Sequence, residues 1–163
     1  MMSIDKQGVY NLLATNNIDY EAVEHDAVFT VEEMNALDLP HPESVAKNLF
    51  LRDDKKRTFY LLVMPESKQV NLKEVRAILQ SRPLSFASEK YLEQYLSLTR
   101  GAVSPFGAFN DADNKVLVYF DKEYEGKLIG CHPNDNTASV FLQTNELATL
   151  IRQHGNSVEF IEL

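Results

Sequence analysis

Two neighbouring apolar runs place the strongest constraint on the fold of this 163-residue chain. Residues 45–52 read VAKNLFLR and residues 57–64 read RTFYLLVM, with four charged residues at 53–56 between them. Apolar and aromatic runs that flank a short polar connection predict an antiparallel hairpin. A purely parallel, doubly wound sheet is disfavoured, because its strands are joined by long crossover connections.

Strand and helix signals alternate along the rest of the chain. We expect further strands at residues 19–24, 84–87, 116–120, 127–131, 138–142 and 157–163. Helix starts are expected at Ser3, at the capping box formed by Thr30 and Glu33, and at Asn71, Ser88 and Thr144. Seven or eight strands with four or five helices predict an α/β (α+β) fold with a mixed sheet. No repeat or linker divides the chain, so residues 1–163 are expected to form a single domain.

Composition excludes several classes of protein. Hydrophobic residues make up 44% and charged residues 25%, which is typical of a globular domain and not of a disordered one. The single cysteine, Cys131, excludes an intramolecular disulfide, and the four scattered histidines lack zinc-site spacing, so no metal is expected. We also expect no membrane span and no signal peptide, and therefore a cytoplasmic location, because no apolar run approaches 18 residues and charges precede the first one.

The net charge of −8 argues at first against a nucleic-acid partner. The charges are unevenly distributed, however. Residues 47–100 contain eleven basic and six acidic residues, a net of +5, whereas the segments on either side are acidic. This excess indicates either an ordinary solvated hairpin and helix or a surface that follows phosphates. The second interpretation requires the basic side chains to share one face.

Lys47 and Asn48 are unusual because they interrupt an apolar strand. A lysine in such a position commonly lies at a sheet edge with its amine in water. The alternative is a positioned cation that lines a pocket and holds a phosphate or a developing negative charge.

The segment Gly101–Gly107 contains two glycines and a proline within seven residues, after a helix and before a strand. It could be a plain turn, or a rigid loop whose backbone N–H groups bind an anion or an oxyanion. Ser104 is not expected to be a nucleophile, because the segment lacks the GxSxG spacing of a nucleophile elbow.

Cys131 and His132 begin a polar loop between two apolar strands. A Cys–His dyad is disfavoured, because adjacent residues on extended backbone point to opposite faces. A buried cysteine beside a loop histidine is the simpler interpretation. His132 could still donate a hydrogen bond in a pocket or act as a general acid or base.

These three stretches, in this order and spacing, resemble the free-standing prolyl-tRNA editing proteins (the YbaK/ProX family), which are related to an insertion domain of bacterial prolyl-tRNA synthetase. The resemblance begins at Phe29 and extends to the final helix and strand. It implies a compact fold with a mixed, partly barrel-like β-sheet surrounded by helices, and no cofactor. It also implies hydrolysis of the ester between a wrong amino acid and the terminal adenosine of tRNA(Pro).

The resemblance also implies a role for individual residues. Lys47 is expected to hold the terminal adenosine and its phosphate, Gly101 to position water or the oxyanion through its loop backbone, and His132 to form the pocket wall. Substrate-binding residues are expected at Asn48, Ala102, Val103, Ser104, Pro105, Phe106 and Asn134. We expect the tRNA to contact the basic hairpin at Arg52, Lys55, Lys56 and Arg57.

Within the family, the Lys47–Asn48 pair and the His132 loop resemble the alanine-clearing branch. The resemblance therefore implies mischarged Ala-tRNA(Pro), bound at its acceptor end, as the substrate, and prolyl-tRNA synthetase as a second partner. An aminoacyl ester is already activated, so water and a preorganised backbone suffice without a protein nucleophile. Two alternatives remain open. One is a deacylase for Cys-tRNA(Pro) or another small aminoacyl-tRNA, and the other is a non-catalytic module that binds tRNA or a synthetase.

Overall fold

The predicted hairpin forms the centre of the larger of two sheets. In the computed structural model, which describes residues 3–163, β2 (Ala46–Asp53) and β3 (Phe59–Pro65) pair antiparallel as expected. The connection turns at Lys56, whose φ is 56°. The buried Asp53 carboxylate accepts hydrogen bonds from the backbone N–H groups of Arg57 and Thr58 at 2.9 and 3.4 Å, which closes the turn.

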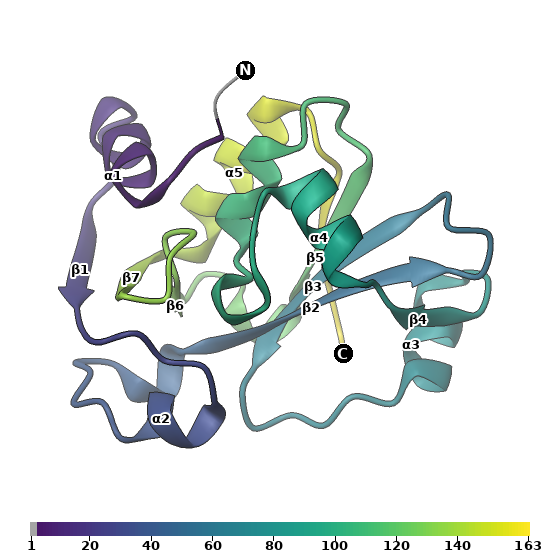
Figure 1. Cartoon of the computed structure of the whole chain (residues 1–163), viewed down its shortest axis with the longest axis horizontal. Coiled ribbons are helices and arrows are strands. Elements are labelled where there is room, and N and C mark those ends of the chain that lie inside the picture. The colour runs from purple at the N-terminus through teal and green to yellow at the C-terminus, as the bar shows by residue number, and fades with distance from the viewer. Residues whose placement is uncertain (1–2) are drawn as a thin grey trace.

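The larger sheet has the strand order β4-β2-β3-β5-β8 (Figure 1). The edge strand β4 (Leu84–Phe86) pairs antiparallel with β2, whereas β5 (Val116–Asp121) is parallel to β3 and β8 (Val158–Ile161) is parallel to β5. The sheet is therefore mixed, as predicted. The parallel pairs are possible because long connections that contain helices separate these strands in the sequence.

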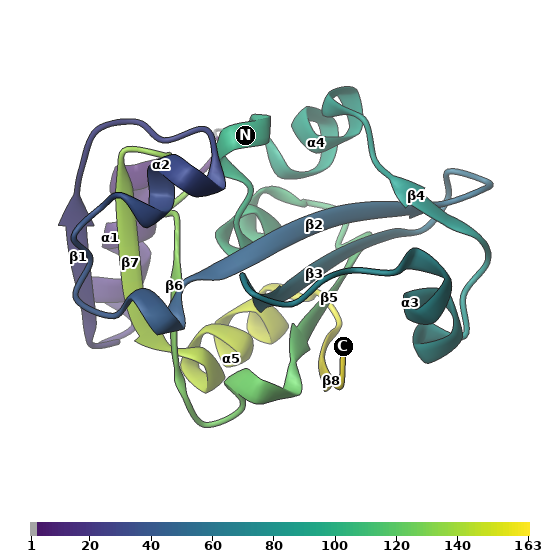
Figure 2. The same ribbon diagram turned by 90° about the horizontal axis from the view of Figure 1, so that it is seen from below.

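A second, antiparallel sheet has the order β1-β7-β6, from β1 (Tyr20–Glu24), β7 (Ala138–Gln143) and β6 (Leu128–Cys131). It meets the larger sheet at a bridge between Val45 and Gly130 (Figure 2). A Cβ at Gly130 would lie 2.6 Å from the Phe141 ring, so the close packing of this ring on the backbone of Gly130 requires glycine. The partly barrel-like arrangement that we expected is thus two linked sheets, and they do not close into a barrel.

Side-chain caps explain where most helices begin. The helices are α1 (Lys6–Thr15), α2 (Val31–Asn35), α3 (Leu72–Leu79), α4 (Glu89–Leu96) and α5 (Thr144–His154). Thr30 accepts a hydrogen bond from the N–H of Glu33, and Asn71 caps α3, as predicted. The helix α1 is present, but its predicted start at Ser3 was wrong. The N-cap is Asp5, whose carboxylate accepts a hydrogen bond from the N–H of Gly8 at 2.8 Å. Ser3 lies before the helix, because the next residue, Ile4, donates its N–H to the side chain of Asn110 and is held outside the helix.

One hydrophobic cluster joins both sheets with α1, α4 and α5, and it includes Leu13, Phe106, Phe120, Ile129, Val140 and Leu147. A second cluster lies under α3 on the other face of the larger sheet, around Leu51, Leu62 and Val75. The larger sheet is therefore covered on both faces. No helix within residues 3–163 is both long and apolar enough to cross a bilayer.

Candidate active site

A pocket of about 210 Å³ lies beside the bridge that links the two sheets. It is lined by the segment that leads into α2, the beginning of β2, the loop at Gly101 and the residue after β6. Five residues predicted for the site line it: Lys47, Asn48, Gly101, Val103 and His132. The fold therefore brings all three unusual stretches of the sequence to one place.

Sequence reasoning did not assign the remaining lining residues to a site. They include the charged residues Glu66 and Arg100 and the apolar residues Val28, Phe29 and Met34. Arg100 directly precedes Gly101, and this adjacency to a predicted site residue was the one feature of the sequence that could have assigned Arg100 to the pocket. The apolar residues belong to the capped α2 region, whose pattern indicated a helix start and nothing about a pocket.

Lys47 is half-buried at the beginning of β2, and its ammonium donates a hydrogen bond to the backbone carbonyl of Lys68. The amine is therefore held by the protein and does not extend freely into water. The side-chain oxygen of the adjacent Asn48 is buried and accepts no hydrogen bond from the described residues. A buried acceptor in this condition is available to a donor on a ligand.

The carbonyl that holds Lys47 belongs to a loop anchored by an ion pair. The Lys68 ammonium lies 2.7 Å from the carboxylate of Asp121, which is 1% exposed, and 3.6 Å from that of Glu123. The hydrogen bond to Asp121 outweighs the effect of burial and raises the pKa of Lys68. The Lys68–Asp121 pair thus fixes the loop to β5 and, through the loop carbonyl, orients Lys47.

His132 lines the pocket, and one hydrogen bond fixes which of its ring nitrogens carries the proton. Its Nδ1 lies 2.8 Å from the backbone carbonyl oxygen of Ala138, which can only accept, so Nδ1 carries the proton and Nε2 does not. Burial lowers the pKa of His132, and the neighbouring His25 ring lowers it further, although the hydrogen bond to Ala138 acts in the opposite direction. His132 is therefore a neutral hydrogen-bond acceptor at pH 7.

The loop at 101–107 divides into a pocket-facing part and a buried part. Gly101 and Val103 line the pocket, and a Cβ at Gly101 would lie 3.2 Å from Cδ1 of Phe29. The predicted residues Ala102, Ser104, Pro105 and Phe106 are buried behind it. The Ser104 hydroxyl accepts from the N–H of Phe106 at 3.1 Å, so it caps a short 3₁₀ helix (Pro105–Asn110).

Asn134 does not line the pocket but ties its walls together. Its φ is 61°, and its amide group donates to the carbonyls of Ile4 and Phe106 at 3.0 and 3.3 Å. Asn136 likewise donates to the carbonyl of Val28 at 2.8 Å. These bonds connect the His132 loop to the 101–107 loop and to the segment that leads into α2.

Cys131 faces the core, and burial raises the pKa of its thiol far above the ordinary value. The thiol is therefore protonated at neutral pH and is not a nucleophile. Within residues 3–163 the structure contains no group of three or more His, Cys, Asp or Glu side chains that could hold a metal ion.

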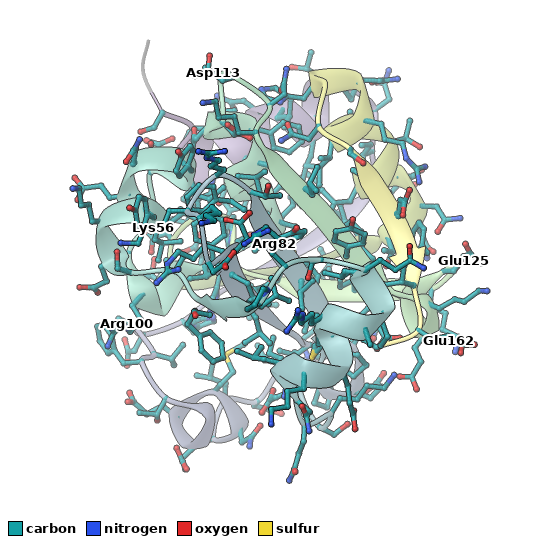
Figure 3. All side chains as sticks on the ribbon, turned by 90° about the vertical axis from the view of Figure 1, so that its right-hand side faces the viewer. Lys56, Arg82, Arg100, Asp113, Glu125 and Glu162 are labelled. Atoms are coloured by element: carbon teal, nitrogen blue, oxygen red, sulfur yellow. The ribbon has the colours of Figure 1, made fainter. Side chains whose placement is uncertain are left out.

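The basic hairpin lies at the other end of β2 from the pocket. Asp53 lies six positions after Lys47, a distance of about 20 Å along a strand. Lys55, Lys56 and Arg57 are exposed there, while Arg52 is half-buried. Figure 1 shows the hairpin on the right and α2 on the left, and Figure 3 looks onto the hairpin end with Lys56 labelled.

The aminoacyl-tRNA editing domain family matches residues 25–150, a range that includes every residue lining the pocket. The chain belongs to this family, and its class is that of the aminoacyl-tRNA deacylases, hydrolases that act on an ester bond. The prolyl-tRNA editing protein ProX of Acetoanaerobium sticklandii is 44% identical over 159 residues, which cover 97% of each chain.

Two further similarities extend the comparison. The prolyl-tRNA synthetase associated domain-containing protein 1 of Bos taurus is 33% identical over 153 residues, covering 88% of this chain and 86% of that protein. A crystal structure described as that of a candidate trans-editing enzyme for prolyl tRNA synthetase superposes with a TM-score of 0.68 at 18% identity, covering 100% of this chain and 99% of the other. This likeness supports the fold that we describe.

Proposed function

We propose that this chain is a trans-editing deacylase that hydrolyses mischarged Ala-tRNA(Pro). The observation that carries the proposal is the convergence of a held cation, Lys47, and a neutral acceptor, His132, on one small pocket in a member of the editing family. The name of the Acetoanaerobium relative supports tRNA(Pro) as the tRNA.

In the proposed reaction water attacks the ester carbonyl without a protein nucleophile, and the bond between the acyl carbon and the ribose oxygen breaks. The proton that the water loses passes through His132 Nε2 to the departing ribose oxygen, so that alanine and the free hydroxyl of the tRNA are released. His132 Nε2 accepts a hydrogen bond from the attacking water, and Lys47 holds the terminal adenosine and its phosphate. The backbone at Gly101, which carries no side chain of its own and lines the pocket, approaches the aminoacyl end closely. The predicted substrate-binding residues buried behind it, Ala102, Ser104, Pro105 and Phe106, hold this loop rigid.

The preference for alanine is proposed from the walls of the pocket. Val28, Met34, Val45 and Val103 surround it with apolar surface that fits a methyl group. A pocket that accepts the smaller amino acid and excludes the proline ring would act as a second sieve after a synthetase that separates the two poorly. Cysteine is also small, so the substrate panel must include it.

We also propose the wider setting of the reaction. Residues 1–163 would form one editing domain, which is supported by the packing of Leu13 of α1 and Val158 of β8 in the same cluster. The acceptor end of the tRNA enters the pocket while the hairpin at Lys55 and Lys56 contacts the phosphate backbone. Prolyl-tRNA synthetase in the cytoplasm supplies the mischarged tRNA.

The test is a deacylation assay on alanyl-, cysteinyl- and prolyl-tRNA(Pro). We expect hydrolysis of the alanyl ester, and Lys47→Ala should lower kcat/KM about 100-fold, the effect expected from loss of a hydrogen bond to a charged phosphate. Lys73→Ala, which removes an exposed lysine on α3, is the matched control and should match the unaltered protein.

Three results would contradict parts of this proposal. Faster hydrolysis of the cysteinyl ester would move the specificity to cysteine. Salt-dependent tRNA binding without turnover on any substrate would indicate a non-catalytic module. Full activity of Lys47→Ala would remove the lysine from the mechanism.

A further inference from the structure

A second hollow, of about 330 Å³, adjoins the active-site pocket. The two share Asn48, Arg100 and Val103 as lining residues, so they are continuous along one wall. The second hollow, which we call the side groove, is otherwise lined mainly by apolar residues of β2, β4 and α4, among them Phe50, Phe86 and Leu92. A ligand that occupies the pocket can therefore extend into the side groove.

Phe86 is exposed in a way that its packing does not explain. Its exposed fraction is 58%, and the other large apolar side chains exposed to a similar degree within residues 3–163 are Phe29, at 73%, and Ile78, at 45%. Phe29 lines the pocket and Phe86 lines the side groove, so both exposed phenylalanines lie at these two hollows. An exposed aromatic ring face is a platform on which a nucleobase can stack.

The side groove runs along an open part of the β2 edge. β4 pairs with β2 from Leu51 to Asp53, and the N–H of Ala87 donates to the Phe50 carbonyl at 2.9 Å. The backbone N–H and C=O groups of every second residue in a strand point to the same neighbouring strand. Those of Asn48 therefore face the same edge as those of Phe50, at a position that β4 no longer covers. The groove thus combines an aromatic ring with backbone donors and acceptors.

Arg100 supplies a cation at the boundary between the two hollows. Its side chain is 82% exposed, and its nearest acidic partner is Glu89 at 3.8 Å. An exposed pair at this distance is weak, so the guanidinium can exchange the carboxylate for a phosphate. Aromatic surface, an open backbone edge and an exposed cation beside an ester-binding pocket match the parts of a nucleotide.

We propose that the side groove binds a nucleobase of the single-stranded 3′ end of the tRNA, stacked on Phe86 with the adjoining phosphate at Arg100. This inference rests on the proposed function, because the aminoacyl ester must occupy the neighbouring pocket. The base is either the terminal adenine or the base before it, since the shared wall lies next to the ribose that carries the ester.

The first test measures stacking without hydrolysis. An uncharged oligonucleotide that ends in CCA carries 2-aminopurine either at its last position or at the one before it, and the unaltered protein should quench its fluorescence at one of the two. Phe86→Leu should lose this quenching, Phe86→Tyr should keep it, and Ile78→Ala, which alters an exposed apolar residue on α3, should not affect it. The position that is quenched identifies the base.

The second test measures turnover. On alanyl-tRNA(Pro), Phe86→Leu should lower kcat/KM on the order of tenfold, the effect expected from loss of one base–aromatic stack, and Phe86→Tyr should restore it. Equal quenching by Phe86→Leu and the unaltered protein at both positions overturns the inference, whatever the hydrolysis. Quenching that depends on Phe86 without turnover of any alanyl ester leaves the inference standing and refutes the proposed function.

Discussion

Removal of the Lys68 ammonium should weaken both the fold and the active site. Lys68→Met keeps most of the length of the side chain and deletes the charge that lies 2.7 Å from the Asp121 carboxylate. Asp121 is 1% exposed and would retain the hydrogen bond from the N–H of Glu123 at 2.9 Å, without a cation in contact. The variant therefore leaves a buried charge uncompensated.

The expected loss of stability is about 3 kcal/mol. Breaking one side of a buried ion pair typically destabilises a protein by about 3–5 kcal/mol, and the lower end applies because Lys68 is 29% exposed. Asp121→Asn removes the charge and keeps an acceptor for Glu123, so it should lose about 1 kcal/mol. The double variant should be more stable than Lys68→Met alone, because it contains no unpaired charge.

Urea unfolding of the four proteins measures this coupling, with Lys122→Met, an exposed lysine on the neighbouring turn, as the control. The pKa of Lys68 is raised in the folded protein above its ordinary 10.5. Its contribution to stability is therefore complete below pH 10.5 and is lost only as the pH rises further. The difference between Lys68→Met and the unaltered protein should thus be constant from about pH 6 to pH 9.

The same variant tests how Lys47 is positioned. If the loop shifts when its anchor is removed, kcat/KM on alanyl-tRNA(Pro) should fall at least about tenfold under conditions in which the variant is fully folded. An unchanged unfolding midpoint would refute the buried-pair argument. Unaltered kcat/KM in a destabilised Lys68→Met would show that the loop carbonyl does not orient Lys47.

Three other predictions concern the pocket and the hairpin. Because the pKa of His132 is held below its ordinary 6.5, kcat/KM should be flat near pH 7 to 8 and fall only below pH 6.5. His132→Asn should abolish this acidic decrease in a pH–rate profile. The free energy of unfolding should also fall below pH 6.5, since the unfolded chain takes up the proton at a higher pH than the folded one. Gly101→Ala places a Cβ 3.2 Å from Phe29 Cδ1, so KM for alanyl-tRNA(Pro) should rise severalfold while the melting temperature stays nearly unchanged. Charge reversal at Lys55 and Lys56 should raise KM for alanyl-tRNA(Pro) at low salt and leave the hydrolysis of alanyl-adenosine, which lacks the tRNA backbone, unaffected. If the variant and the unaltered protein have the same KM for alanyl-tRNA(Pro), the hairpin does not contact the tRNA.

Local signals in the sequence predicted most of the secondary structure. The β2–β3 hairpin, the cap at Thr30 and the cap at Asn71 were all found from neighbouring residues, because each depends on hydrogen bonds or backbone conformations within a few positions. The exception was α1. Asp5 and Ser3 are both good caps, and the choice depended on the distant Asn110, which holds Ile4 outside the helix.

Sequence patterns could also mark unusual residues without deciding what they do. Lys47 in an apolar strand was compatible with an edge lysine in water or with a pocket cation. The structure shows its ammonium on the carbonyl of Lys68, a contact between strands and loops that no local pattern contains. The side groove at Phe86 had no signal at all, because its exposure depends on where β4 ends against β2.

The sequence by itself determined the mixed α/β class, the order of the strands and helices, and the three stretches that meet at the pocket. Tertiary structure alone decided that the strands form two sheets joined at Val45 and Gly130, and that Lys47 and His132 line one pocket while the basic hairpin lies about 20 Å away along β2. The physical reason is the distance along the chain over which each interaction acts. Caps, turns and alternation act between neighbours, whereas β1 pairs with β7 and Lys68 with Asp121 across long separations, through packing and charge that exist only once the chain has folded.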